Sequence, residues 1–233
     1  QQGITGYPSL NLYTVGEGTK KFQGRKTEED ITTFIVSLLP DRMVDLWAGN
    51  LDKWTRSEQN KFRAWLVVFC DKGEECMQHT DKRLLGAALD GLTSMGMVDC
   101  SLDGDICDQL RGQNQDSRML FFPQGIEKGN AVQLSSSIHE HREIADEVLY
   151  NLPEFITIDT KSYEELRRRL DKDVGPSWMV YFVLGKDGDS LEYRKLAPLL
   201  PRLRIGKVDC REDTSICSEL RIGKFPSFSI FKV

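Results

Sequence analysis

The 233-residue sequence has no long hydrophobic run and no excess of basic residues. No apolar stretch reaches the roughly 18 to 20 residues that a membrane-spanning helix needs. A formal net charge of −5 and a pI near 5.4 argue against nucleic acid or an anionic membrane as a partner. A basic block such as Arg167–Arg169 is no longer than one helix face, so we expect it to form a solvated surface.

Targeting signals are also missing. The Gln-Gln-Gly start has neither the charged nor the apolar region of a signal peptide. No Asn-x-Ser/Thr acceptor site is present, so glycosylation gives no information about the compartment. The chain is otherwise ordinary for a globular protein, with 39% apolar and 29% charged residues.

The six cysteines form three pairs that are local in the sequence: Cys70 with Cys76, Cys100 with Cys107, and Cys210 with Cys217. An even number at local, repeated spacings predicts disulfides and an oxidising compartment. Zinc is the competing interpretation. However, its usual Cys-x2-Cys spacing is absent, and the histidines (His79, His139 and His141) do not repeat with the cysteines. We expect neither a metal nor a cofactor.

Two of these pairs belong to an internal repeat. The motif at 207–210, Lys-Val-Asp-Cys, is followed by Ile-Cys-Ser-Glu-Leu at 216–220. Its counterpart lies 110 positions earlier, as Met-Val-Asp-Cys at 97–100 and Ile-Cys-Asp-Gln-Leu at 106–110. An aromatic-Pro-Ser segment at 225–231 also echoes one at 7–13. A unit of about 110 residues is therefore repeated.

Hydrophobic periodicity divides the chain into three parts. Residues 1–40 predict strand, turn, strand and helix, with Thr27 capping the helix. Residues 41–152 predict a complete βαβαββα order, and 153–233 begin the same order but lack its last strand and helix. The expected helices include 52–62, 75–92, 139–151 and 162–170.

The partial units have two explanations. The simpler one is a chain cropped from a longer multidomain protein, because a ββα piece cannot bury a core alone. The alternative is that residues 1–40 complete the third unit by permutation or swapping. That alternative requires Leu10 to lie beside Ile230 in one sheet.

Each unit resembles a thioredoxin-fold domain, an α/β fold with a mixed central sheet flanked by helices. Thioredoxins keep a cis proline where an aromatic-Pro-Ser segment leads into a strand. The resemblance therefore implies cis bonds at Tyr7–Pro8 and Phe225–Pro226, which composition would not, since only about 5% of X-Pro bonds are cis.

The thioredoxin active-site motif is absent. Disulfide exchange needs a thiolate at a helix N-terminus with a second thiol two residues on. The segments at 69–76 and 182–190 contain no Cys-x-x-Cys, and Ser117 falls where Pro226 falls in the next unit. The acidic residues Asp71, Glu74 and Glu75 would also raise a thiol pKa. We therefore expect no catalytic residue in 41–233.

The cysteine pairs then have other uses. Cys70 and Cys76 could form a structural bridge, a regulatory redox pair or two free thiols. The other two pairs are expected to hold the short third helix of each unit on its strand. Closing an eight-residue loop stabilises a fold by about 2.5 kcal/mol.

Several motifs resemble the endoplasmic-reticulum DnaJ/thioredoxin disulfide reductases of the DnaJ homologue subfamily C member 10 type. They are Leu-Trp-Ala-Gly-Asn at 46–50, the cysteine segment 69–76, Leu-Asp-Gly-Leu at 89–92, Val-Asp-Cys at 98–100 and Asn-Leu-Pro-Glu-Phe at 151–155. The resemblance implies that 1–40 end a catalytic thioredoxin domain. It also implies that 41–152 form the first non-catalytic domain and 153–233 most of the second.

The same resemblance implies a place in the cell and a set of partners. Such proteins reduce disulfides of misfolded clients in the endoplasmic-reticulum lumen and recruit the lumenal Hsp70 (BiP) for degradation of those clients. Without a J domain or Cys-x-x-Cys, this segment is expected to be inactive alone and monomeric, and to act as a rigid spacer and docking platform. The alternatives are client binding, as in protein disulfide isomerase, and the Cys70/Cys76 redox pair. Calcium storage would need far more acid.

Overall fold

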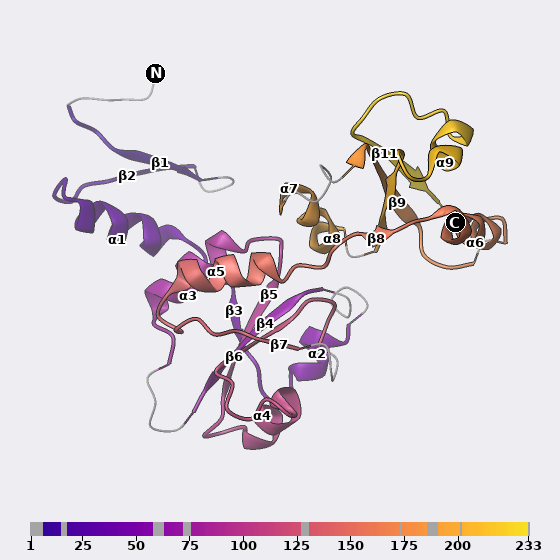
Figure 1. Cartoon of the computed structure of the whole chain (residues 1–233). Helices are drawn as coiled ribbons and strands as arrows, with labels where there is room; N and C mark the ends of the chain where they lie inside the picture. The colour runs from indigo at the N-terminus through magenta and orange to yellow at the C-terminus, as the bar shows by residue number, and fades with distance from the viewer. Residues whose placement is uncertain are drawn as a thin grey trace.

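The computed structural model describes residues 7–14, 18–57, 63–71, 76–126, 131–172, 174–185, 191–200 and 202–232. These residues form a two-stranded, a five-stranded and a four-stranded sheet, each with its own helices (Figure 1). The predicted α/β class, with mixed sheets flanked by helices, is confirmed. Within the described ranges, no helix is both long and apolar enough to cross a membrane.

The N-terminal part is a hairpin followed by a helix. Strands β1 (Asn11–Thr14) and β2 (Gly18–Lys21) pair antiparallel, and α1 (Glu28–Leu38) follows. The Thr27 hydroxyl accepts from the Asp30 N–H at 3.3 Å, so it caps the helix as predicted. Three acidic residues in the first turn also suit the positive end of the helix dipole.

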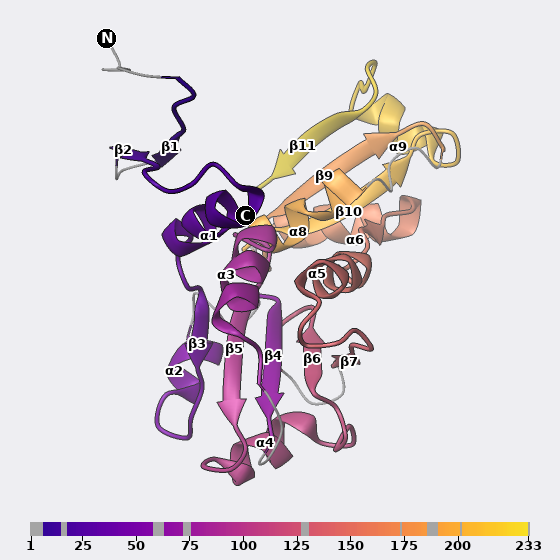
Figure 2. The ribbon, with the colours of Figure 1, turned by 90° about the vertical axis from the view of Figure 1, so that its left-hand side faces the viewer.

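The first complete unit comprises β3 (Met43–Asp45), α2 (Leu51–Thr55), β4 (Trp65–Cys70), α3 (His79–Ala88), β5 (Ser94–Asp99), α4 (Gly104–Arg111), β6 (Met119–Phe122), β7 (Val132–Gln133) and α5 (His141–Tyr150). It has the predicted βαβαββα order from β4 to α5, and β3 and α2 precede that order. The sheet order is β3-β5-β4-β6-β7. Strands β3, β5 and β4 are parallel, whereas β6 and β7 are antiparallel to their neighbours (Figure 2).

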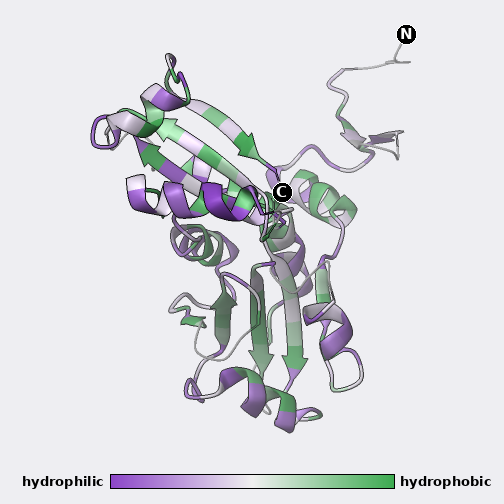
Figure 3. Ribbon diagram, turned by 90° about the vertical axis from the view of Figure 1, so that its right-hand side faces the viewer, coloured by the Kyte–Doolittle hydropathy of each residue, from purple (hydrophilic) through white to green (hydrophobic). Residues whose placement is uncertain are grey.

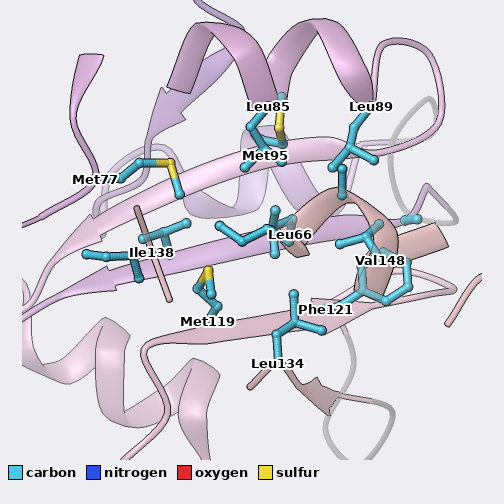
Figure 4. Close-up of a cluster of buried hydrophobic side chains, with 14 of the residues drawn as sticks. Leu66, Met77, Leu85, Leu89, Met95, Met119, Phe121, Leu134, Ile138 and Val148 are labelled. Atoms are coloured by element: carbon cyan, nitrogen blue, oxygen red, sulfur yellow. The ribbon is translucent and has the colours of Figure 1, made fainter. Parts of the chain in front are cut away.

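Helices cover both faces of this sheet. On one face α3 and α5 bury Leu66, Met119 and Phe121 of the strands, as Figure 4 shows. On the other face α2 and α4 pack against Trp65, Val67, Phe69 and other apolar residues. Residues 65–69 are at most 1% exposed, which explains their continuous apolar run.

A carboxylate fixes the approach to the last helix. Glu147 of α5 accepts hydrogen bonds from the backbone and hydroxyl groups of Ser135 and Ser136, at 2.7 to 3.1 Å. Burial alone would raise the pKa of Glu147, but these hydrogen bonds outweigh it and lower the pKa. The charged form of Glu147 therefore stabilises the fold.

Several helix boundaries differ from the prediction. Helix α2 ends at Thr55, and residues 58–62 of the expected helix lie outside the described part of the chain. Helix α3 begins only at His79, because Gln78 before it is extended, with ψ 155°. It ends at Ala88, three residues before Gly91, whose φ of 73° takes the chain out of the helix. His139 lies in the turn before α5 instead of on the helix.

The second unit has a four-stranded sheet. Its elements are β8 (Ile156–Thr157), α6 (Thr160–Leu170), β9 (Trp178–Val183), α7 (Leu191–Arg194), α8 (Leu196–Leu199), β10 (Arg204–Asp209), α9 (Thr214–Glu219) and β11 (Ser227–Phe231). The sheet order is β11-β9-β10-β8. Helices α6 and α9 cover one face and α7 and α8 lie on the other. Figure 3 shows hydrophobic residues concentrated in the strands of both larger sheets.

The swapping alternative is wrong. Among the described strands, β11 pairs only with β9. Strand β1 pairs with β2 in a separate sheet. Leu10 accepts a backbone hydrogen bond from Phe22, on the far strand of its own hairpin. Figures 1 and 2 both show the hairpin well away from β11. The N-terminal part therefore does not complete the second unit.

The repeat holds in atomic detail at two glycines. A Cβ at Gly96 would lie 2.3 Å from Leu46 Cδ1, and a Cβ at Gly206 would lie 2.2 Å from Ile158 Cδ1. In both units a tryptophan ring carbon is the next neighbour, at 3.5 and 3.3 Å respectively. Only glycine lets the strand approach its neighbours this closely.

Candidate functional site

Thioredoxin-type enzymes place their chemistry where the central strand ends, so this region is the candidate site of each unit. In the first unit, Cys70 is the last residue of β4 and is bonded to Cys76, with the two Cα atoms 5.3 Å apart. Cys76 precedes α3 by three residues, so it does not lie on a helix with His79, as the expected helix over 75–92 implied. His79 instead lies 3.5 Å from Asp41.

The other cysteines hold short helices on strands. Cys100–Cys107 joins the end of β5 to α4, and Cys210–Cys217 joins the end of β10 to α9. The Cα separations are 5.7 and 5.8 Å, so the two bridges are equivalent. Every cysteine of the chain is bonded in the structure. Whether the Cys70–Cys76 bond is structural or redox-active stays a prediction.

A buried arginine occupies the first site. Arg111, at the end of α4, is 8% exposed and reaches Asp71 with Nη1 at 3.0 Å and Nη2 at 2.5 Å. Its Nε donates to the Ser117 carbonyl at 3.0 Å, and its guanidinium lies 4.7 Å from the centre of the Phe69 ring. The space beside the Cys70 disulfide is therefore filled by an ion pair.

The arginine changes the electrostatic argument made from the sequence. Asp71 cannot simply raise the pKa of a thiol here, because its carboxylate is paired with Arg111. Glu74 and Glu75 lie outside the described residues. Sequence reasoning missed Arg111, although Leu-Arg recurs 110 residues apart, at 110–111 and 220–221. This recurrence of Leu-Arg was the sequence signal that could have identified Arg111 as a site residue.

Strand register places Ser117 and Pro226 at the same point. Val68 pairs with Met119 in the first unit, and Tyr181 pairs with Phe228 in the second. Ser117 and Pro226 each precede the paired residue by two positions. Ser117 is 1% exposed. The structure has a cis bond at Phe225–Pro226.

The remaining predicted loop lies elsewhere. Tyr7–Pro8 is also cis, but it precedes β1, and Tyr7 is 92% exposed. The hairpin that it leads into, β1 and β2, lies away from both larger sheets (Figure 1). Phe225, in contrast, lies next to α9 and to the Cys210–Cys217 bridge, where it lines a shared hollow.

The aspartate of each Val-Asp-Cys motif forms a turn. Asp99 accepts from the Ser101 N–H at 2.9 Å, and Asp209 accepts from the Arg211 N–H at 3.0 Å. Hydrogen bonds from the Ser101 hydroxyl and backbone lower the pKa of Asp99. Burial would raise the pKa of Asp209, but N–H donors from Gly185 and Arg211 lower it. These carboxylates therefore shape the turn before each cysteine helix.

Two further arginines join the three parts of the molecule. Arg83 of α3 donates to the Val36 and Ser37 carbonyls at the end of α1, at 3.1 and 2.5 Å. Arg194 of α7 donates to the Tyr150 carbonyl at 2.8 Å and to the Leu152 carbonyl.

The physical reason for these contacts lies at the helix ends. The last carbonyls of a helix lack intrahelical partners and carry partial negative charge. Neither α1 nor α5 has a basic residue in its own last turn. An arginine from the adjacent part supplies the cation in each case. At the second joint, a Cβ on Gly91 would also lie only 3.2 Å from Leu199 Cδ2 of α8.

Strand order and helix placement define a thioredoxin-fold protein, and its sequence contains no Cys-x-x-Cys pair. No family model matches the sequence. The chain is 33% identical over 238 residues to DnaJ homologue subfamily C member 10 of Xenopus laevis and 30% identical over 242 residues to the Homo sapiens protein. Each match covers 99% of this chain. The resemblance inferred from the motifs is confirmed.

Solved structures agree with this relationship. A crystal structure of ERdj5, form II, matches 98% of this chain with a TM-score of 0.64 and 27% identity. Full-length ERdj5 matches 96% with a TM-score of 0.60. The chain spans 29% of the length of the curated relatives and about 30% of the solved chains. The boundaries expected at 40/41 and 152/153 stay predictions.

Proposed function

We propose that this chain is a non-catalytic scaffold that sets the distance between flanking domains of an endoplasmic-reticulum disulfide reductase. The observation that carries the proposal is the pair of joints made by Arg83 and Arg194, which fix each part to its neighbour through helix-end carbonyls. A segment that only tethers domains would not need such contacts. By its likeness to DnaJ homologue subfamily C member 10, the whole protein would work with the lumenal Hsp70 on misfolded, disulfide-bonded clients.

The chemistry of the described residues supports a structural role. Exchange requires a low-pKa thiolate at a helix N-terminus and a resolving thiol two residues away. In the first unit the two cysteines are six residues apart and Cys76 stands before the helix. In the second unit Val183 occupies the position of Cys70, and Leu184 occupies that of Asp71. We expect the purified chain to reduce insulin disulfides no faster than the background rate, and faster reduction would refute the proposal.

The spacing role is tested by distance measurements. Glu29 in α1 and Arg168 in α6 are both exposed, and the distance between spin labels at these two positions spans both joints. We expect a narrow distance distribution that broadens in Arg83→Met and Arg194→Met. Arg56→Met is the matched control, since it removes an ion pair with Asp52 inside one unit. A broad distribution in the unaltered chain, or no change in the joint variants, would contradict the spacing role.

A further inference from the structure

Two equivalent arginines have opposite surroundings. Arg111 and Arg221 lie at the same repeat position, Arg111 as the last residue of its cysteine helix and Arg221 two residues beyond its own. Arg111 is buried against Asp71, whereas Arg221 is exposed and makes no ion pair with the described residues. The position of Asp71 is taken by Leu184 in the second unit. The second site has therefore kept the cation and lost its carboxylate.

The ends of the two helices explain where each guanidinium lies. In the first unit Arg111 is the last residue of α4, and Gly112 after it takes the left-handed conformation, with φ 56°. In the second unit α9 ends at Glu219, and Arg221 itself takes that conformation, with φ 55°. The Ile222 N–H bonds to the Cys217 carbonyl at 2.9 Å, closing the helix end. Arg221 therefore leaves the helix and turns outward.

A surface hollow lies beside Arg221. Its volume is about 470 Å³, and its lining includes Leu184, Ile222, Phe225, Arg221 and the Cys210–Cys217 bridge. The lining is mostly apolar, with hydroxyl groups from Thr214 and Ser218 and the one cationic side chain of Arg221. Phe225 adds the cis peptide bond that leads into β11.

Three described acidic side chains of this unit are already engaged. Asp209 accepts from the Gly185 and Arg211 N–H groups, Asp213 accepts from Thr160, and Glu219 pairs with Arg167. No carboxylate within the described part of the chain neutralises Arg221. The hollow therefore combines apolar surface with a positive charge that no described carboxylate compensates.

We propose that this hollow binds an extended peptide segment of a partner protein that carries a carboxylate side chain next to an apolar one. The carboxylate would meet Arg221 as Asp71 meets Arg111 in the first unit, through a two-pronged charge-assisted hydrogen bond. The apolar neighbour would lie on Leu184 and Phe225. The site does not depend on the spacing role, because none of its residues contributes to either arginine joint.

The test uses fluorescent eight-residue peptides of alternating leucine and glutamate, with glutamine and lysine versions as controls. Binding to the full chain is followed by fluorescence anisotropy. We expect Arg221→Gln to weaken the glutamate peptide at least about tenfold, the usual scale of a charge-assisted contact. The glutamine peptide should bind the unaltered chain as weakly as the glutamate peptide binds Arg221→Gln. Higher salt should weaken only the glutamate peptide.

Two further variants make the outcome decisive. Arg204→Gln removes the same charge at the other end of β10, roughly 20 Å away along the strand, and should bind normally. Arg221→Gly suits the left-handed backbone, so it should fold at least as well and still lose binding. The site would be overturned if Arg221→Gln bound the glutamate peptide as tightly as the unaltered chain does, or if the glutamine peptide bound as tightly as the glutamate peptide. NMR amide shifts centred on Ile230 of β11, instead of on the hollow, would overturn it as well. Unchanged affinity in Arg194→Met would separate it from the spacing role.

Discussion

Removing the Arg111 guanidinium should selectively destabilise the first unit. Its hydrogen bond to the Ser117 carbonyl is worth about 1.5 kcal/mol and its contact with the Phe69 ring about 1 kcal/mol. The pair with Asp71 adds only about 1 kcal/mol, because the Asp71 side chain is 35% exposed and therefore screened by solvent. Methionine keeps part of the apolar stem. We therefore expect Arg111→Met to lower the free energy of unfolding of this unit by about 3 kcal/mol.

Hydrogen exchange across a urea series reports the two units separately, through peptides from β4 and from β9. A loss of about 3 kcal/mol corresponds to a midpoint shift of about 2 M urea for the β4 peptides. Arg221→Met is the matched control and should change the β9 peptides by no more than about 0.5 kcal/mol. A double-mutant cycle with Asp71→Asn should give a coupling of about 1 kcal/mol. A loss below 1 kcal/mol in Arg111→Met, or equal losses in both arginine variants, would refute this account.

Four smaller predictions follow from the same structure. Intact mass of the folded chain should be six hydrogens below the reduced value, and free-thiol labelling of Cys100 would contradict this. Replacing Cys100 and Cys107 by alanine should cost about 2.5 kcal/mol of unfolding free energy. The folded-state pKa of Glu147 is lowered, so its contribution to the free energy of unfolding is present above about pH 4.5 and is lost as pH falls through the folded-state pKa. In urea unfolding at pH 7, Glu147→Gln should be less stable than the unaltered chain by about 1 kcal/mol. Its urea midpoint should also change less between about pH 5 and pH 3. Gly96→Ala should cost about 1 to 3 kcal/mol, because its methyl group would meet Leu46, and an unchanged urea midpoint would exclude that contact.

The fold was predictable because its signals are local and occur twice. The apolar run at 65–69 identified the central strand, and the Val-Asp-Cys motifs identified the strand and helix that follow. Helix boundaries were less accurate. The polar segment before His79 favours a helix by composition, yet it includes Cys76, which is bonded to the strand, and Gln78, which is extended. A tertiary constraint therefore overrides local preference there.

The candidate sites were only partly predictable. The sequence shows directly that Cys-x-x-Cys is absent. It does not show that Arg111 pairs with Asp71 in the first unit, or that a hollow lies beside Arg221 in the second. Five residues separate Arg111 from Ser117, whereas four separate Arg221 from Pro226. This difference of one residue moves the left-handed position from a glycine onto the arginine. Since arginine is an unusual residue in that conformation, no sequence pattern would have placed it there.

The two arginine joints have a consequence for how such an array can change over time. Each joint is received entirely by main-chain oxygens, at 36–37 in one case and at 150 and 152 in the other. Any side chains compatible with a helix end would present the same acceptors, so the receiving helix is free to vary. For these hydrogen bonds, only the arginine donor must be kept. Neighbouring modules can therefore drift in sequence, or be exchanged for other modules ending in a helix, without losing their alignment.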